Sequence, residues 1–152
     1  MGAQGFARAT LASLAFLAGG ATARADCFDW SFSGSTVESG TLRGLPSGPL
    51  AWWAGVAPAG GQHWMTAVEV RWTDAAGRQH RQELFDAVQD GRPGLRVRGG
   101  RLELRIAYCQ TGQPCRGTTL PFTWDRARAR FMGATPAARN AVAEACSSAS
   151  TG

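Results

Sequence analysis

Short stretches in which apolar and polar residues alternate recur along the chain, and this period of two is typical of half-buried β-strands. In residues 64–72, for example, tryptophan, threonine and valine occupy every second position and would share one face of a strand. The pattern predicts strands over residues 27–33, 36–43, 64–72, 78–85, 95–98, 101–108 and 118–124, and residues 128–132 can pair with the last of these.

Turn residues between these strands indicate hairpins. Residues 73–77 end in glycine, and Gly99-Gly100 supplies the positive φ angles that a two-residue hairpin turn requires. Residues 44–61 are rich in glycine, proline and alanine, and we predict a long loop there with at most one short strand. Pro121 lacks a backbone donor, which predicts an edge strand or a bulge at its position.

A helix is predicted near the C-terminus. Thr135 is a suitable N-cap, Pro136 suits the first helical position, and the alanine-rich stretch 137–146 follows. Residues 147–152 are expected to be a disordered tail. We therefore expect a single mainly β domain over residues 26–146, an antiparallel meander or sandwich of about seven strands with a short C-terminal helix.

The first 25 residues have the features of a secretory signal peptide. Arg8 precedes the apolar stretch 11–18, and the region ends in Ala-Arg-Ala at 23–25, a small-residue cleavage motif. We expect cleavage after Ala25 and a mature chain that begins at Asp26. The apolar stretch is shorter than the roughly 20 residues of a spanning helix. The alternative is a disordered segment or a core helix at the N-terminus.

Composition bears on location more than on chemistry. All 16 basic residues are arginine, which together with the abundant alanine and glycine indicates a GC-rich bacterial genome. The expected location is therefore the periplasm or the outside of a bacterial cell. Loss of Arg8 and Arg24 lowers the net charge from +5 to about +3, which does not require a nucleic-acid partner. No segment after the signal is apolar enough to span a membrane.

The four cysteines all follow the predicted cleavage point. An even number in a small exported domain predicts two disulfides, although free buried thiols are the alternative. Four cysteines allow three pairings. The simplest of them joins Cys109 to Cys115 within a short loop, and Cys27 to Cys146 near the two ends of the mature chain.

Familiar catalytic and cofactor motifs are missing from the sequence. His63 and His80 are its two histidines, and no metal-ligand spacing, phosphate-binding loop or nucleophile elbow occurs. We therefore expect no metal, no cofactor and no catalytic residue set. A paired-carboxylate hydrolase remains open in principle, but Glu69, Glu83 and Glu103 fall within strands, where solvated positions are the simpler interpretation.

Three groups of residues are candidates for binding. A disulfide across the loop would make a rigid projection suited to docking, although a simple turn staple is an equal alternative. Trp52 and Trp53 offer a recognition surface, but adjacent strand residues point opposite ways, so one of them should be core. Four arginines on one predicted hairpin would form a patch for an acidic protein or an anionic envelope polymer. The alternative is an ordinary solvated face on which Glu103 is their ion partner. The candidates are Gln110, Thr111, Gly112, Gln113, Pro114, Trp52, Trp53, Arg96, Arg98, Arg101 and Arg105.

One segment resembles a known family. The sequence Cys-Arg-Gly-Thr-Thr-Leu-Pro-Phe-Thr-Trp at 115–124, followed by Phe-Met-Gly at 131–133, is similar to the region around the disulfide loop of the periplasmic inhibitors of vertebrate-type lysozyme, the Ivy family. The similarity covers about residues 108–133. It implies that Cys109 and Cys115 staple the loop.

The resemblance has clear departures. The family's loop has four residues between its cysteines, one of them an inhibitory histidine, whereas this loop has five residues and no histidine. The inhibitory residue therefore does not transfer, and a protein of net charge about +3 would not be steered toward a basic lysozyme. A wider class is also implied: periplasmic proteins that bind and restrain a cell-wall hydrolase or a secreted toxin. The alternatives are a small exported enzyme acting on an envelope polymer and a structural envelope protein.

Overall fold

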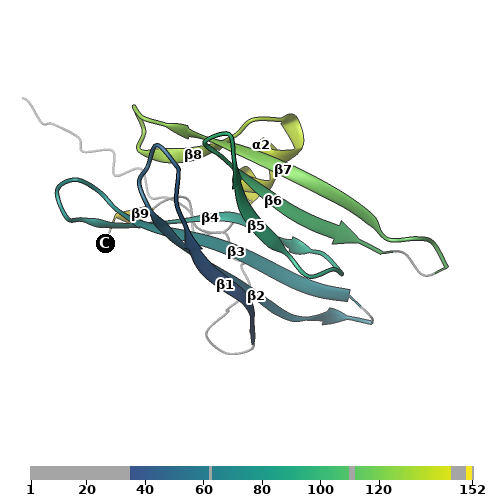
Figure 1. Ribbon diagram of the computed structural model, residues 1–152. Coiled ribbons are helices and arrows are strands. Elements are labelled where there is room, and N and C mark those ends of the chain that lie inside the picture. The colour runs from purple at the N-terminus through teal and green to yellow at the C-terminus, as the bar shows by residue number, and fades with distance from the viewer. Residues whose placement is uncertain (1–34, 62, 110–111, 145–149, 152) are drawn as a thin grey trace, which may run out of the picture.

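The structure, a computed structural model, describes residues 35–61, 63–109, 112–144 and 150–151. Within them the chain forms two antiparallel β-sheets and one short helix, which confirms the predicted mainly β fold (Figure 1). The predicted signal peptide, the strand at 27–33 and the pairing of Cys27 with Cys146 lie outside the described residues.

The first sheet has the order β1-β2-β3-β4-β9 and the second the order β5-β6-β7-β8. The first contains β1 (Ser35–Leu42), β2 (Leu50–Gly60), β3 (His63–Thr73), β4 (Gln79–Val88) and β9 (Ser150–Thr151). The second contains β5 (Gly94–Arg98), β6 (Arg101–Tyr108), β7 (Arg116–Asp125) and β8 (Arg130–Gly133). The two-residue strand β9 lies in the segment 147–152, which was expected to be disordered.

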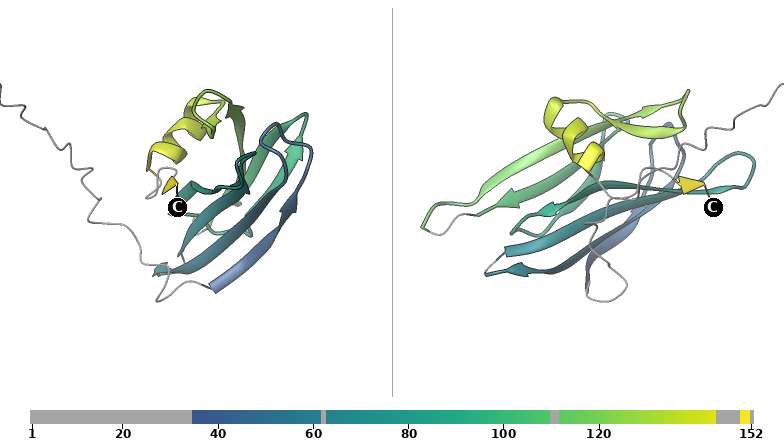
Figure 2. Two further views of the ribbon diagram at one scale, coloured as in Figure 1. Left: turned by 90° about the vertical axis from the view of Figure 1, so that its left-hand side faces the viewer. Right: turned by 180° about the vertical axis from the view of Figure 1, so that it is seen from behind.

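Because the strands run up and down in sequence order, their connections gather at two opposite ends of the molecule (Figures 1 and 2). The β2–β3 turn, the β4–β5 connection and the β6–β7 hairpin lie at one end, which we call the disulfide end. The turns that close the β1–β2, β3–β4, β5–β6 and β7–β8 hairpins lie at the other.

The core lies between the two sheets. Each sheet contributes inward side chains at alternate positions, among them the fully buried Val68 and Val70 of β3 and Leu102 and Leu104 of β6. An aromatic cluster fills the region beside them, where the rings of Trp72 and Trp124 meet edge to face at 5.3 Å and those of Trp124 and Phe131 at 4.9 Å. Such edge-to-face pairs are favoured by the ring quadrupoles.

One buried glutamine joins the two sheets. Gln82 of β4 donates from Nε2 to the carbonyl oxygen of Phe131 and accepts at Oε1 from the Phe131 amide, both at 2.8 Å. The side-chain amide thus bonds the main chain of β8 as a neighbouring strand would. Without it these buried main-chain groups would be orphaned.

Helix α2 (Pro136–Glu144) packs directly on β8. Thr135 Oγ1 accepts from the Ala138 amide at 3.2 Å, which confirms the predicted N-cap. At Gly133 a Cβ atom would lie 2.3 Å from the carbonyl carbon of Ala138, so the helix backbone approaches the strand as only glycine permits.

Two expectations about strands are wrong. Residues 44–61 are not mainly loop, because β2 is an 11-residue strand over Leu50–Gly60, in which small residues such as Ala54 pack against the core. Pro121 is neither on an edge strand nor at a bulge, since β7 lies between β6 and β8 in continuous register. The Pro121 carbonyl accepts from the Ala134 amide, which lies just beyond the end of β8. The N–H that proline lacks would point to the same side, where β8 has already ended, so no ladder bond is lost.

Candidate functional site

The hairpin between β6 and β7 carries the predicted disulfide. Cys109 and Cys115 are bonded, with their Cα atoms 4.1 Å apart. Gly112, Gln113 and Pro114 are all exposed, while Gln110 and Thr111 lie outside the described residues. The hairpin extends beyond the rest of the second sheet at the disulfide end (Figures 1 and 2).

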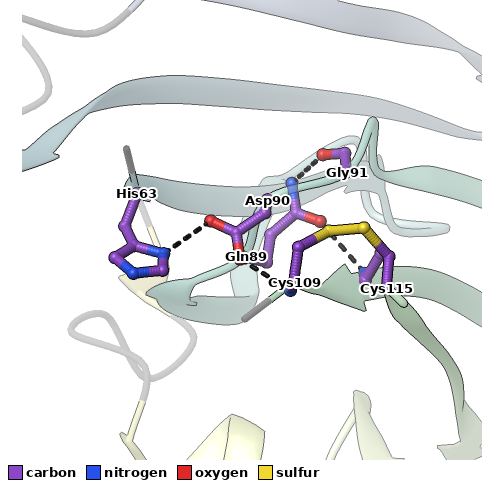
Figure 3. The surroundings of a disulfide bond; sticks show 7 residues. His63, Gln89, Asp90, Gly91, Cys109 and Cys115 are labelled. Carbon is purple, nitrogen blue, oxygen red and sulfur yellow. Dashed lines mark hydrogen bonds and ion pairs between the residues drawn. A yellow bond between two sulfur atoms is a disulfide. The ribbon is translucent and has the colours of Figure 1, made fainter. Parts of the chain in front are cut away.

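Asp90 ties the base of this hairpin to the first sheet. Its Oδ2 accepts from the Cys109 amide at 2.8 Å, and its Oδ1 accepts from Nδ1 of His63, at the start of β3, at 2.9 Å (Figure 3). The Cys109 amide, followed by the imidazole, holds the pKa of Asp90 below its usual range. The carboxylate therefore stays ionised as the acceptor of both bonds.

Gln89, which is 1% exposed, makes a second connection (Figure 3). Its Nε2 donates to Thr66 Oγ1 at 3.1 Å and also to the Gly91 carbonyl, and its Oε1 accepts from the Ala107 amide at 3.2 Å. The main-chain amide of Gln89 donates to the carbonyl of Trp64 at 2.9 Å. One side chain thereby contacts β3, the β4–β5 connection and β6.

These bonds extend the pairing of β6 past the point where β5 begins. Gly94, the first residue of β5, lies opposite Arg105, so Ala107 and Cys109 have no partner on β5. Gln89 and Asp90 take that place, since the Asp90 amide also donates to the Ala107 carbonyl at 2.9 Å. The hairpin base is therefore held by main-chain and side-chain bonds to both sheets, as well as by the disulfide.

Exposed apolar side chains gather at the same end of the molecule as this hairpin. Within the described part of the chain, three large hydrophobic side chains are exposed: Trp64 at 45%, Tyr108 at 47% and Val88 at 38%. All three lie at the disulfide end, at the start of β3 and at the ends of β6 and β4. The ring of His63 stacks parallel to that of Tyr108, with centroids 6.1 Å apart.

By alternation along β6, Tyr108 shares the inward face with Leu102, Leu104 and Ile106, yet its side chain is 47% exposed. The strands extend beyond the core at this end, so the inward positions nearest the hairpin are uncovered. Trp64 is exposed for the same reason, although it shares a strand face with the buried Val68 and Val70. The one signal the sequence offers is that Trp64 begins its alternating pattern and Tyr108 ends its own.

A surface hollow of about 480 Å³ lies beside Trp64. Val37, Val56, Arg92 and Pro93 line it together with Trp64. The Arg92 Nε donates to Glu38 Oε2 at 2.6 Å, which links the β4–β5 connection to β1. The hollow is large enough for one or two apolar side chains of a partner.

The other candidate residues lie elsewhere. Trp52 is 8% exposed and belongs to the core, as expected for one of the two tryptophans. Trp53 is half-buried and donates from Nε1 to Thr36 Oγ1 at 2.6 Å. The four candidate arginines lie on the outer face of the β5–β6 hairpin, where Arg96 donates to Glu103 at 2.9 and 2.7 Å. The structure does not bring these groups together with the disulfide hairpin.

The carboxylates show one departure from expectation. Glu69 pairs with Arg71, whereas Glu83 is 8% exposed rather than solvated, and it is hydrogen-bonded to Asp86 on the same strand. Burial raises the pKa of Asp86, and the bond with Glu83 opposes this rise. His80 bonds Asp74 at 2.9 Å and stacks on a core tryptophan, so it braces a turn.

No cluster of three or more potential metal ligands occurs among the residues that the structure describes. The same residues include no helix long and apolar enough to cross a membrane. Comparison with known proteins finds no match to a family model, a curated protein or a solved structure.

Proposed function

We propose that this is an exported bacterial protein that binds another protein through its disulfide end. It acts in the periplasm or outside the cell, as an inhibitor or immunity-type partner of a cell-wall hydrolase or a secreted toxin. The observation that carries the proposal is the coincidence of two features. The exposed large hydrophobic side chains of the described residues all lie at the same end of the molecule as a hairpin that both sheets hold in place.

This combination suits a protein partner. Tyrosine and tryptophan are enriched among the residues that dominate binding energy at protein interfaces. A hairpin already fixed by the disulfide and by Asp90 loses little conformational freedom on binding, so less of the contact energy is spent on ordering. The hollow beside Trp64 adds a place for a partner's apolar side chain.

Location is supported by the sequence and by the disulfide. The first 25 residues match a secretory signal, and disulfides persist in oxidising compartments such as the periplasm. The disulfide between Cys109 and Cys115 is consistent with that compartment. The segmental resemblance to lysozyme inhibitors makes lysozyme the first target to test.

The test measures lysis of cell-wall suspensions by several lysozyme types with and without the purified protein. We expect inhibition of at least one enzyme, with Tyr108→Ala and Trp64→Ala each weakening it about tenfold or more. Gln79→Ala, an exposed change at the opposite end of β4, should leave inhibition unchanged.

A lack of effect on every lysozyme type would exclude the lysozyme-inhibitor form of the proposal. The hydrolase or toxin encoded nearest the gene would then be tested by titration calorimetry with the same variants. Binding that is equally strong for Tyr108→Ala, Trp64→Ala and the unchanged protein would show that the disulfide end is not the interface.

A further inference from the structure

The end of the molecule opposite the disulfide is rich in exposed arginine. This end is formed by the turns of the β1–β2, β3–β4, β5–β6 and β7–β8 hairpins (Figures 1 and 2). Exposed arginines lie in these turns or at the strand positions that flank them. We call this set the arginine pole: Arg43, Arg78, Arg98, Arg101, Arg126 and Arg128.

The charge of the arginine pole is only partly balanced. Arg78 pairs with Asp74 at 2.9 Å, and Arg128 pairs with Asp125 at 2.6 Å. The remaining four arginines of the pole have no ion pair with any described residue. The pole therefore carries an uncompensated positive charge far from the disulfide hairpin.

Two of these arginines are placed directly against each other. Arg98 and Arg101 are the cross-strand partners that flank the Gly99-Gly100 turn, and both side chains are exposed. Opposed residues have Cβ atoms about 5 Å apart, and like charges in that position oppose pairing. At the next residue pair on this face, by contrast, the charge of Arg96 is balanced by Glu103. Fold stability therefore gives no reason for the arrangement at the turn.

The charged surface continues along the outer face of β6. Arg105 is exposed on the same face as Arg101, four residues along the strand, which corresponds to about 13–14 Å. It too lacks an ion pair among the described residues. Between Arg101 and Arg105 on this face lies Glu103, whose charge Arg96 balances, so the guanidinium groups of the pole continue past this ion pair toward the middle of the second sheet.

We infer that the arginine pole binds a linear anionic polysaccharide, one whose carboxylate or sulfate groups recur along the chain. The guanidinium group is suited to such ligands because its planar donors match a carboxylate or sulfate in pairs. This extended charged surface favours a linear polymer over a single small anion.

The chemistry of the pole argues against two other polyanions. A membrane-binding surface combines cations with apolar side chains that insert among lipids. A single-stranded nucleic acid is gripped by aromatic side chains that stack on its bases. The exposed large hydrophobic side chains of the described residues all lie at the other end of the molecule. The pole can therefore recognise a ligand by charge alone, and an anionic polysaccharide, which has no bases to stack, needs no more than that.

The test compares binding of the full chain to heparin and to alginate, a sulfated and a carboxylated linear polysaccharide, by titration at several salt concentrations. We expect binding that weakens steeply with salt. Arg98→Gln combined with Arg101→Gln should lower the affinity about tenfold or more and reduce the salt dependence. The charge-matched control combines Arg116→Gln and Arg139→Gln, two exposed arginines outside the pole, and should lower affinity less than threefold.

Three outcomes would overturn the inference. They are no binding to either polysaccharide, an equal loss in the control variant, and tighter binding to a single-stranded oligonucleotide or to anionic phospholipid vesicles at the same charge concentration. Thermal unfolding of both double variants verifies that each is folded. Because the readout is polysaccharide binding, its result is independent of whether the disulfide end binds a hydrolase.

Discussion

Replacement of Gln82 by leucine tests how the two sheets are held together. Leucine has a similar volume but cannot bond the amide and the carbonyl of Phe131, which both meet Gln82 at 2.8 Å inside the protein. A buried main-chain group left without a partner costs about 1–3 kcal/mol. Two such groups give about 2–6 kcal/mol, from which the added apolar burial of leucine subtracts about 1 kcal/mol. We expect Gln82→Leu to lower the free energy of unfolding by about 3 kcal/mol.

Urea unfolding measures this change. With a slope of about 2 kcal/mol per molar urea, the midpoint should fall by about 1.5 M. Gln79→Leu is the matched control, because Gln79 is exposed on the same strand and surface changes of this kind stay within about 0.5 kcal/mol. A loss below about 1 kcal/mol for Gln82→Leu would refute the conclusion that this amide closes the edge of β8.

Gln89→Leu extends the test to the disulfide end. The change removes the bond to the Ala107 amide and loosens the base of the hairpin, so hydrogen exchange at Ala107 and Cys109 should accelerate about tenfold or more. Gln82→Leu is comparably destabilising but lies far from these amides. Equal acceleration in both variants would show that exchange there requires global unfolding and that Gln89 has no local role.

Three further changes test other contacts. Gly133→Ala should lower the free energy of unfolding by about 1–3 kcal/mol because its Cβ would collide with the backbone of α2, whereas Gly94→Ala, with open space around it, should have little effect in the same urea assay. The pKa of Asp90 is lowered in the folded state, so the stability it contributes is complete above about pH 4 and is lost as the pH falls through the lowered pKa. Unfolding curves between pH 2 and 5 should therefore show a shallower loss of stability for Asp90→Asn, and an unchanged slope would contradict this. Arg98→Gln should raise the melting temperature slightly, because it removes the repulsion with Arg101 across the turn. A lower melting temperature would mean that Arg98 makes a stabilising contact.

The parts of the fold that the sequence predicted are those that local chemistry determines. Gly99 and Gly100 both have positive φ, as the two-residue turn requires. Thr135 caps the helix from the position that its side chain suggests. The β3–β4 hairpin follows from alternation over nine residues and from the glycine turn at Gly77.

The strand β2 was missed because its residues have low β-propensity. Ala54, Gly55 and Ala57 are small, and in isolation they resemble a loop. In the sheet they are buried on β2, which lies between β1 and β3. Tertiary packing therefore determined a conformation that local preference did not indicate.

The candidate site was predicted in part for a related reason. Six positions of separation were enough to suggest the Cys109–Cys115 bond. The anchoring residues Gln89 and Asp90 lie 18 and 19 positions from the amides of Ala107 and Cys109 that they bond, and a turn sequence gives no sign of such contacts. Exposure of Tyr108 depends on where the core ends, which only the packed structure shows.

The disulfide and Asp90 have separable roles in presenting the hairpin. The Cys109–Cys115 bond closes the hairpin on itself but does not orient it relative to the sheets. Orientation comes from Gln89 and Asp90 together, and Asp90 bonds both the Cys109 amide and the His63 ring. Reduction of the disulfide should therefore loosen the exposed residues 112–114 while the Cys109 amide stays protected. Asp90→Asn should do the reverse, weakening protection of that amide while the disulfide keeps the hairpin closed. A binding surface that spans the hairpin and Trp64 needs both, because its two halves must keep a constant separation to be recognised at low entropic cost.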